Sequence, residues 1–532
     1  MRTFSTAVLF LFLFMIPAFA VADVREITAE GSYIMGDGET PLAAEERALQ
    51  KAKRAALEEA GTYVESYSKV ENLQLTRDEV QVLASGIMDV TVLEKKRTMA
   101  GEGLIVWVRI SARIQTDEVK KMAARVRDRD AAEDYGNLRK SYEDSRRELD
   151  RLKAELSRSK GKKEAKPLQE KITQDEKRLQ ASAWLEKGLQ FYLRDEFGPA
   201  VAAYTSAIEL DSGYADAYAN RGNAYQRQGL FDRAITDYTR ALELEPGAAY
   251  IHRNRGLAYR EMRKYDQALK ELNRAIALNP NSASAYDGRG TVYRRMGKPD
   301  RAIEDFDRAI ALNPDGSSSY HNRGSAWFHK GEYDRAIKDY NRSLELNPAS
   351  SLAFHHRGNS HLMAGRLDQA IADLDRAIAL EPSDAGTYYN RGDAYLKKNR
   401  LKQALSDLNR AISMDPKLAD AYNTRGIVYR RMNRIERAID DYNRAIALNP
   451  KYDLAFNNRG YARFVQGRLD QAITDYNRAI ALTPGYANAY KNRGTAYKKM
   501  GRKSQALADF RKACTLGSKE ACDAAGALQA GH

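Results

Sequence analysis

Asparagine recurs at a fixed spacing along the C-terminal two-thirds of this 532-residue chain. From Ala181 to Glu520 the sequence divides into ten units of 34 residues, and in six of them the sixth position is asparagine. These residues are Asn220, Asn254, Asn322, Asn390, Asn458 and Asn492. Because a carboxamide both donates and accepts hydrogen bonds, such a row can hold the backbone of an extended peptide with little regard to its sequence. The alternative is that the asparagines only bond neighbouring turns.

Positions 12 and 13 of the units carry a second candidate chemistry, the recognition of charge. Basic residues cluster early, at Arg227, Arg260, Arg294 and Arg295, and late, at Arg430, Arg431, Lys498 and Lys499. Between the two clusters the same positions hold Phe328, His329, Leu362 and Met363. The pattern favours a protein or peptide partner with acidic stretches on both sides of an apolar centre. The alternative is an ordinary solvated surface.

Signals for catalysis are missing from the sequence. It has no Gly-rich phosphate loop, nucleophile elbow or metal-ligand cluster, so we expect neither enzyme activity nor a cofactor. His321 and His355 share position 5 of neighbouring units, which would suit a transition metal, but no cysteine or carboxylate pattern supports them. We therefore predict no metal site, and we assign His361 to packing.

Small and aromatic residues recur in the same frame and indicate what each unit is. Glycine occupies position 8 and alanine position 20 in all ten units, while positions 4, 11 and 24 are mostly large and apolar or aromatic. Two helices can cross closely where their facing residues are small, and aromatic side chains can fill the space around the crossing. Proline at position 32 of eight units ends the second helix. Each unit is therefore predicted to be a pair of helices.

This pattern closely resembles the tetratricopeptide repeat. The resemblance implies a mainly α fold, a right-handed α-solenoid of about ten helix pairs over residues 181–520. In that family, positions 2, 5, 6, 9, 12 and 13 of the first helix commonly line a concave groove, so the asparagines and the basic residues would share it. The asparagine row also looks like the ladder in the repeat domain of the O-linked N-acetylglucosamine transferases, which grips a peptide backbone. Gly288, His356 and Thr424 interrupt it here.

An arginine at position 7 accompanies an acidic residue at position 23. Nine units have both, and the first unit lacks both, with Lys187 and Ala203 instead. Joint presence and absence within one chain predicts contact, a charge ladder along the stack that contributes about 0.2–1 kcal/mol per pair. Arg240, at position 26, could join the ladder. Position 15 requires a left-handed residue and is mostly Gly or Asn, so Arg263 there is predicted to mark a local distortion.

Residues 23–117 lack the period and predict a small α+β domain. We expect a strand in VREITAEGSYIM, a helix from Pro41, a short helix from Asp78 to Ser85, and two strands joined near Gly101. Ala44, Ala48, Ala52, Ala55, Ala56 and Ala60 are predicted to form the face of the long helix that lies against the sheet. The segments AEGSY, AEERALQKAKRAALEEAG and ASGIMDVTVLEK resemble the N-terminal domain of the flagellar assembly protein T family. That resemblance implies an exported protein of a Gram-negative envelope.

The first 22 residues have the layout of a secretory signal peptide. A basic Arg2 precedes an apolar run from Ala7 to Ile16, and small residues end at Ala22, the expected cleavage site. The run is shorter than the roughly 20 residues that a membrane span requires. The alternative is an uncleaved membrane anchor. The predicted location is the periplasm, with outer-membrane association as a further option.

Residues 118–180 predict a charged helical linker. Its apolar positions alternate in steps of three and four, as in a coiled coil of about three heptads. With Ser145 completing the series, they are Tyr135, Leu138, Tyr142, Leu149, Leu152 and Leu156, and the spacing resumes at Leu168, Ile172 and Leu179. Two helices folding back as a hairpin and pairing with another chain both fit, as does a solvated spacer.

The only two cysteines, Cys514 and Cys522, lie near the C-terminus. The phrase ACTLGSKEAC resembles the paired cysteines of cysteine-rich helical-repeat proteins that some bacteria export. That resemblance implies a disulfide between the last repeat and a cap in residues 521–532; two free, packed thiols are the alternative.

The leading interpretation is a non-enzymatic interaction scaffold or adaptor of the cell envelope. The net charge of +14 and the many aromatic residues prompt an alternative, a nucleic-acid or polyanion-binding repeat protein. The export signal weakens it, as does the location of the aromatics at predicted core positions.

Overall fold

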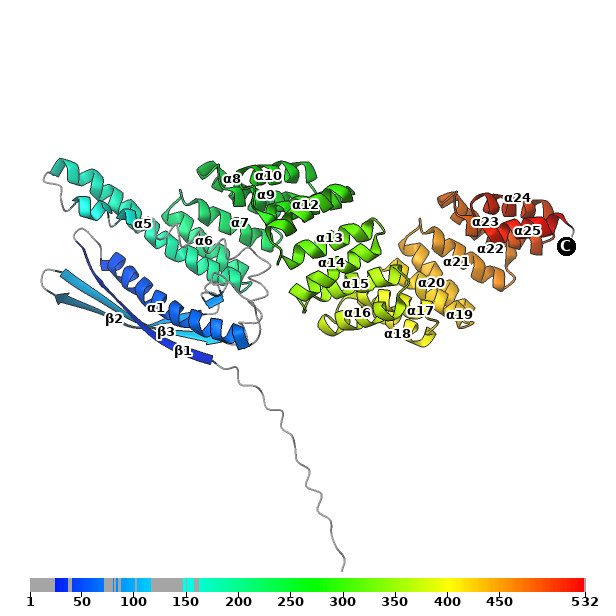
Figure 1. The fold of residues 1–532 in the computed structure, drawn as a ribbon, viewed down its shortest axis with the longest axis horizontal. Helices are drawn as coiled ribbons and strands as arrows, with labels where there is room; N and C mark the ends of the chain where they lie inside the picture. The colour runs from blue at the N-terminus through cyan, green and yellow to red at the C-terminus, as the bar shows by residue number, and fades with distance from the viewer. Residues whose placement is uncertain are drawn as a thin grey trace, which may run out of the picture. The chain divides into compact units, whose positions relative to one another are not determined.

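The computed structural model describes residues 24–36, 41–70, 80, 83, 84, 88–100, 103–115, 147–149, 151–156 and 162–530 (Figure 1). The predicted signal peptide, most of the short helix at 78–85 and the linker residues Tyr135, Leu138 and Tyr142 lie outside these ranges. The chain forms two compact units, residues 1–280 and 281–532, and each is described by itself.

The N-terminal domain is a three-stranded antiparallel sheet in the order β1-β3-β2, with one long helix on one face. Its elements are β1 (Val24–Ile34), α1 (Pro41–Val70), β2 (Met88–Ala100) and β3 (Gly103–Gln115). The strands pair in register along nearly their full length, with a bulge at Val92/Glu94. The small α+β domain predicted from the sequence is therefore present.

Alanines bring α1 close to the sheet. Five of the six predicted alanines are fully buried, but Ala55 is exposed because it breaks the four-residue spacing of the others and turns away from the sheet. A Cβ atom on Gly31 of β1 would lie 2.1 Å from the carbonyl oxygen of Ala48. The strand and the helix can approach this closely only with glycine there.

Ten helix pairs follow the N-terminal domain in the described residues, as predicted. In the first unit they are α5 (Lys162–Leu193), α6 (Phe197–Leu210), α7 (Ala215–Arg227), α8 (Phe231–Leu244), α9 (Ala249–Glu261) and α10 (Tyr265–Leu278). In the second unit they are α11 (Ala283–Arg295), α12 (Pro299–Leu312), α13 (Ser317–His329), α14 (Tyr333–Leu346), α15 (Ser351–Met363), α16 (Leu367–Leu380), α17 (Ala385–Lys397), α18 (Leu401–Met414), α19 (Ala419–Arg431), α20 (Ile435–Leu448), α21 (Asp453–Val465), α22 (Leu469–Leu482), α23 (Ala487–Lys499) and α24 (Lys503–Thr515), and α25 (Lys519–Gln529) follows them.

Position 8 needs glycine because the second helix of the same repeat crosses there. A Cβ on Gly222 would lie 2.7 Å from the ring of Tyr238, which is fully buried at position 24. The same clash would occur between Gly426 and Tyr442. The predicted close crossing is confirmed.

In the turn between the two helices of a repeat, the residue at position 15 has a left-handed backbone conformation, even where it is not glycine. Arg263 has φ 58° and makes the same turn bonds as Gly297, with its amide donating to a carbonyl three residues earlier. The expected distortion at Arg263 is therefore wrong. The flanking helices impose this conformation on Arg263, although a left-handed backbone is about 1–2 kcal/mol less favourable for arginine than a right-handed one.

The described end of the linker packs against α5, the helix that continues into the first repeat. Leu149 and Leu152, in the helical residues 147–149 and 151–156, are buried against Ile172 and Leu179 of α5. Ion pairs reinforce the contact, for example Lys153 with Glu176 at 3.2 Å. The described part thus matches the hairpin alternative. The linker and the first repeat are not separate, because α5 runs unbroken from Lys162 to Leu193.

The N-terminal domain and the first repeat share one hydrophobic core. Leu185, Leu189 and Leu193 of α5 are buried in the same cluster as the inner face of the sheet and α1. At the edge of this contact, Arg194 pairs with Asp89 at 2.6 Å.

At the C-terminal end, Cys514 of α24 and Cys522 of α25 form a disulfide, with their Cα atoms 4.7 Å apart. The side chains of Ala521 and Ala525 of α25 pack on the last repeat, so α25 covers the end of the stack. None of the helices in the described ranges is both long and apolar enough to span a bilayer.

Candidate functional site

Within each unit the first helices of successive repeats contact one another, as α13 and α15 do. Second helices of neighbouring repeats make at most marginal contacts in the described residues. Each unit therefore curves toward its first helices. We call positions 5, 6, 9, 12 and 13 of these helices the inner face; the residues that the sequence singled out for peptide binding occupy positions 6, 12 and 13.

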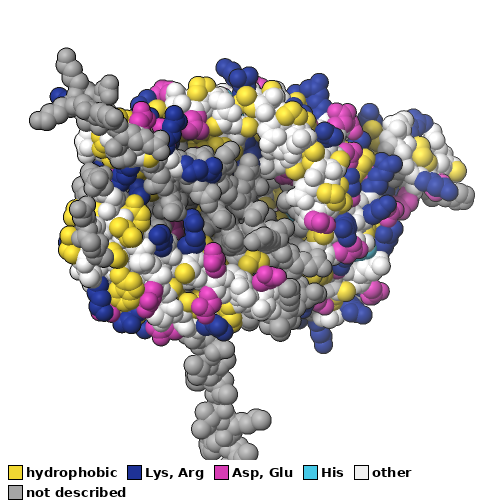
Figure 2. Space-filling model, turned by 60° about the vertical axis from the view of Figure 1, so that its left-hand side comes forward, with side chains coloured by type: hydrophobic (Ala, Val, Ile, Leu, Met, Phe, Trp, Pro, Cys, Tyr) yellow, Lys and Arg dark blue, Asp and Glu magenta, His cyan; other side chains and the backbone are white. Residues whose placement is uncertain are grey.

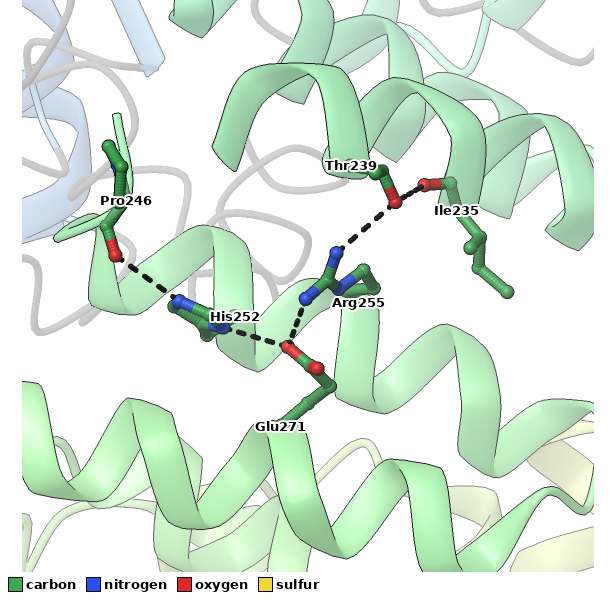
Figure 3. Close-up of polar contacts among 6 residues, drawn as sticks. All are labelled: Ile235, Thr239, Pro246, His252, Arg255 and Glu271. Atoms are coloured by element: carbon green, nitrogen blue, oxygen red, sulfur yellow. Dashed lines mark hydrogen bonds and ion pairs between the residues drawn. The ribbon is translucent and has the colours of Figure 1, made fainter. Parts of the chain in front are cut away.

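One contact recurs from repeat to repeat and ties three helices together. In the third repeat, Arg255 of α9 donates to Glu271 of α10 at 2.8 Å and to the hydroxyl of Thr239, on α8 of the preceding repeat, at 3.2 Å (Figure 3). His252 also contacts Glu271, at 2.7 Å. We call the three-helix contact of the position-7 arginine the arginine clamp.

All nine arginines at position 7 contact the acidic residue at position 23, so the predicted pairing is confirmed. The pairs are Arg221–Asp237, Arg255–Glu271, Arg289–Asp305, Arg323–Asp339, Arg357–Asp373, Arg391–Asp407, Arg425–Asp441, Arg459–Asp475 and Arg493–Asp509. In eight of them, the arginine also donates to position 25 of the preceding repeat: Thr205, Thr239, Asp307, Asn341, Asp375, Asn409, Asn443 or Asn477.

Position 25 is the residue that sequence reasoning missed. Its signal was present, because these eight residues are all short side chains that accept a hydrogen bond. Arg240, at position 26, does not join the ladder; it pairs with Glu243 on its own helix at 2.8 Å.

The arginine clamp is also less exposed to solvent than the sequence predicted. The Asp339 side chain is 7% exposed, and its hydrogen bond is the main cause that raises the pKa of Arg323.

The asparagine row bonds within the protein. Asn458 donates to Asn423 and Asn492 donates to Asn457, both at 2.9 Å, so position 6 of one repeat contacts position 5 of the repeat before it. We call such a contact a rung. Asn322 donates to Asp287 at 3.1 Å and Asn390 contacts His355 at 3.3 Å in the same way.

The first unit departs from this pattern. Asn254 donates to Asn223, at position 9, and Asn220 bonds the backbone of its own helix. The asparagines are thus part of the stack, and their contact with a ligand stays a prediction.

His321 forms its rung with His356. It does not pair with His355, the histidine that shares its position 5 in the neighbouring repeat. The Nδ1 atom of His356 lies 3.1 Å from Nε2 of His321, and the rings stack with centroids 4.9 Å apart. Among the described residues, no group of three or more His, Cys, Asp or Glu side chains could hold a metal ion. His361 is buried, in line with a packing role.

The two clusters of basic residues differ in their partners. In the early cluster, Arg227 lies 3.8 Å from Asp195 and Arg260 pairs with Glu261 at 2.8 Å. In the described ranges, none of the four late residues pairs with a carboxylate; two of them face aromatic rings instead. Arg430 lies 4.9 Å from the Tyr461 ring centroid and Lys499 lies 5.0 Å from that of Phe464.

These late contacts cross from one repeat to the next. Arg431 donates to the backbone of α17, Arg430 reaches α21, and Lys499 of α23 reaches back to α21. Tyr461 and Val465 remain 38% and 48% exposed between them. We call Arg430, Arg431, Tyr461, Phe464, Lys498 and Lys499 the basic-aromatic face.

The apolar centre predicted between the clusters is smaller than expected. Leu362 is buried against Ala370 and Ile371 of α16, so its assignment to the groove is wrong. At position 13, by contrast, Met363 is 50% exposed and His329 is also exposed. Phe328 packs on Tyr333, with ring centroids 5.5 Å apart.

On the face drawn in Figure 2, Lys and Arg side chains are interspersed with Asp and Glu. This view of the side of the N-terminal domain shows no continuous field of one sign. The excess of basic residues is therefore better judged from local contacts than from net charge.

Family models match most of the repeat region. A model described as TPR repeat matches residues 188–229, 256–297, 358–399, 392–433 and 460–501. Two described as Tetratricopeptide repeat match residues 288–351 and residues 215–247, 419–452 and 487–518. The search of curated proteins finds no match.

Several solved structures are similar to this chain. A crystal structure of MamA is 30% identical, covers 30% of this chain and 94% of its own, and has a TM-score of 0.27. YrrB, titled a TPR protein with an unusual peptide-binding site, is 23% identical over 35% of this chain and 95% of its own, with a TM-score of 0.30. Pseudomonas aeruginosa pilF is 23% identical, covers 40% of this chain and 96% of its own, and has a TM-score of 0.36.

Proposed function

The chain belongs to the tetratricopeptide repeat family, and from that premise we propose that it is a non-enzymatic scaffold that binds an extended segment of a partner protein along its inner face. Proteins of this family generally mediate protein–protein interactions. We further propose that the bound segment is acidic beside a short apolar stretch.

One observation carries the proposal: cations and exposed aromatic surface meet on the basic-aromatic face. Each aromatic ring there offers apolar area, and each nearby cation offers a charge that a carboxylate can complement. The Arg430 and Lys499 side chains already lie over rings, so a ligand need not order them from a free state, which lowers the entropy lost on binding. An extended acidic segment with one or two apolar side chains fits this chemistry.

The test is the affinity of the full-length protein for a synthetic peptide. We suggest a fluorescent peptide with Asp and Glu tracts around a Leu-Phe-Met centre, and a second peptide in which Asn and Gln replace every acid. We expect the acidic peptide to bind at least about tenfold more tightly, which corresponds to about 1.4 kcal/mol. The double variant Arg430→Glu/Lys498→Glu is expected to remove that preference.

A matched control changes the same charge elsewhere. Arg444 and Arg478 are exposed on the second helices of repeats eight and nine, so Arg444→Glu/Arg478→Glu should leave peptide affinity unchanged. Equal binding of the two peptides would contradict the acidic preference alone, whereas no binding of either would contradict the proposed function. An oligonucleotide that binds more tightly than the peptide, and loses affinity equally in both double variants, would favour the polyanion alternative.

We also propose export to the periplasm of a Gram-negative bacterium. The leader-like residues 1–22 support this, as does the disulfide, since such bonds persist in oxidising compartments. Osmotic-shock fractionation followed by N-terminal sequencing should find the chain in the periplasmic fraction, beginning just after Ala22. An intact leader on a cytosolic chain would contradict the proposal.

A further inference from the structure

The rung between repeats five and six is built from two imidazoles. His321 of α13 and His356 of α15 approach at 3.1 Å, whereas Asn423 and Asn458 make the equivalent rung between repeats eight and nine at 2.9 Å. A hydrogen bond between two imidazoles needs one N–H donor and one lone pair. Two neutral histidines supply both. Two protonated histidines would instead bring two N–H groups and two positive charges together.

The surroundings offer no compensation for a charge on this rung. Both rings face Tyr340 of α14, with centroids 5.4 and 5.9 Å away. Arg294 of α11, His329 of α13 and His355 of α15 all disfavour a proton on His356, and the His355 ring centroid lies 5.3 Å from that of His356.

Carboxylates on the neighbouring helices contact other residues, as Asp287 of α11 does by accepting from Asn322. Asp339 of α14 and Asp373 of α16 hold their clamp arginines. Asp307 of α12 holds Arg323, and Asp384, at the start of α17, lies 3.2 Å from His355.

We propose that the His321–His356 rung is a proton-sensitive joint: the neutral pair holds repeats five and six together, and acidification loosens the stack at this point of the inner face. The inference concerns the stack itself and does not depend on the proposed ligand. Its consequence for that ligand is that binding across these two repeats would weaken in acid.

The direction of the pH effect follows from burial, which lowers the pKa of His321 to about 4 and that of His356 to about 3, from an ordinary value of 6.5. Above about 6.5 both histidines are neutral in the folded and in the open state, and the joint keeps its full stability. As the pH falls below that value, only the open state takes up protons, so stability is lost progressively toward the lowered pKa values. At about pH 5 the opening equilibrium should rise about thirtyfold for each histidine that is released.

Hydrogen–deuterium exchange of the full-length protein measures this opening helix by helix. The double variant His321→Asn/His356→Asn replaces the pair with the asparagine rung that repeats eight and nine already use. After correction for intrinsic exchange, we expect α13 and α15 of the unmodified protein to open much more at about pH 5 than at about pH 7.5. We expect α19 and α21 to respond little, and the double variant to show no extra response in α13 and α15.

Two outcomes would overturn the proposal: the same pH response in the double variant, or a response spread equally over α19 and α21. If the double variant loses its helical circular dichroism, the single variant His356→Asn takes its place, because Asn390 already contacts His355 in the next rung. The single variant should then show at most half of the pH response of the unmodified protein, compared as the logarithm of the opening equilibrium constant.

Discussion

At the scale of single residues, the arginine clamp holds neighbouring repeats together. The pairing of positions 7 and 23 could be predicted from sequence because the two residues are present or absent together. The third partner, at position 25, could not be predicted. Thr, Asn and Asp are common on protein surfaces, and their role becomes visible only in the structure, where the second helix of the preceding repeat lies beside the arginine. The asparagines show the same limit: their row was visible in the sequence, but the partner at position 5 varies too much to reveal it.

Replacing Arg323 with Met tests the clamp. The change removes contacts to Asp339 and Asp307 and leaves the Asp339 carboxylate buried without its counterion. Because the arginine is partly exposed, we expect a loss of about 2–3 kcal/mol, more than the 0.2–1 kcal/mol of an exposed pair. Urea unfolding measures it. Arg342→Met is the control, since Arg342 makes an exposed pair with Glu345 on its own helix; equal effects of the two changes would refute the clamp.

At the scale of elements, the first helix of repeat one binds the N-terminal domain. Leu185, Leu189 and Leu193 occupy positions 5, 9 and 13, which belong to the inner face in later repeats, yet here they are buried in the shared core. Polar or charged residues fill several of these positions in repeat ten, Lys491 and Lys499 among them. The three leucines were a sequence signal for an intramolecular partner, but the pattern alone could not identify it.

Leu189→Asp in the full chain should separate this domain from repeat one, because a carboxylate cannot be buried there without a partner. We expect faster hydrogen exchange in both α1 and α5, with α23 unchanged. Leu257→Asp provides the control at the same position of repeat three, where the side chain is only half-buried. Protection of α1 that survives in the Leu189 variant would argue against the shared core.

At the scale of the whole molecule, the repeats within each unit contact mainly their neighbours, so stability is expected to be local and the ends to fray first. The helix pairs and the mainly α fold were predictable, because the period is long, regular and repeated ten times. The continuity of α5 through the expected boundary at residue 181 was not, since a helical linker and a helical repeat have the same local pattern.

The terminal disulfide provides a test of this locality. Reducing the Cys514–Cys522 bond should destabilise α24 and α25 by about 2.5 kcal/mol, because the unfolded end regains its conformational freedom. Exchange measured with and without reductant should change there and leave α7 and α8 untouched. A uniform change along the chain would contradict a locally stabilised stack.

The inner face as the binding surface is tested most directly by photo-crosslinking. A benzoylphenylalanine at Tyr461, on the basic-aromatic face, and another at Arg444, on a second helix, would each be exposed to the acidic peptide in the full-length protein. We predict efficient crosslinking from position 461 and background levels from position 444. Crosslinking that is equal at the two positions, or stronger at 444, would contradict the account.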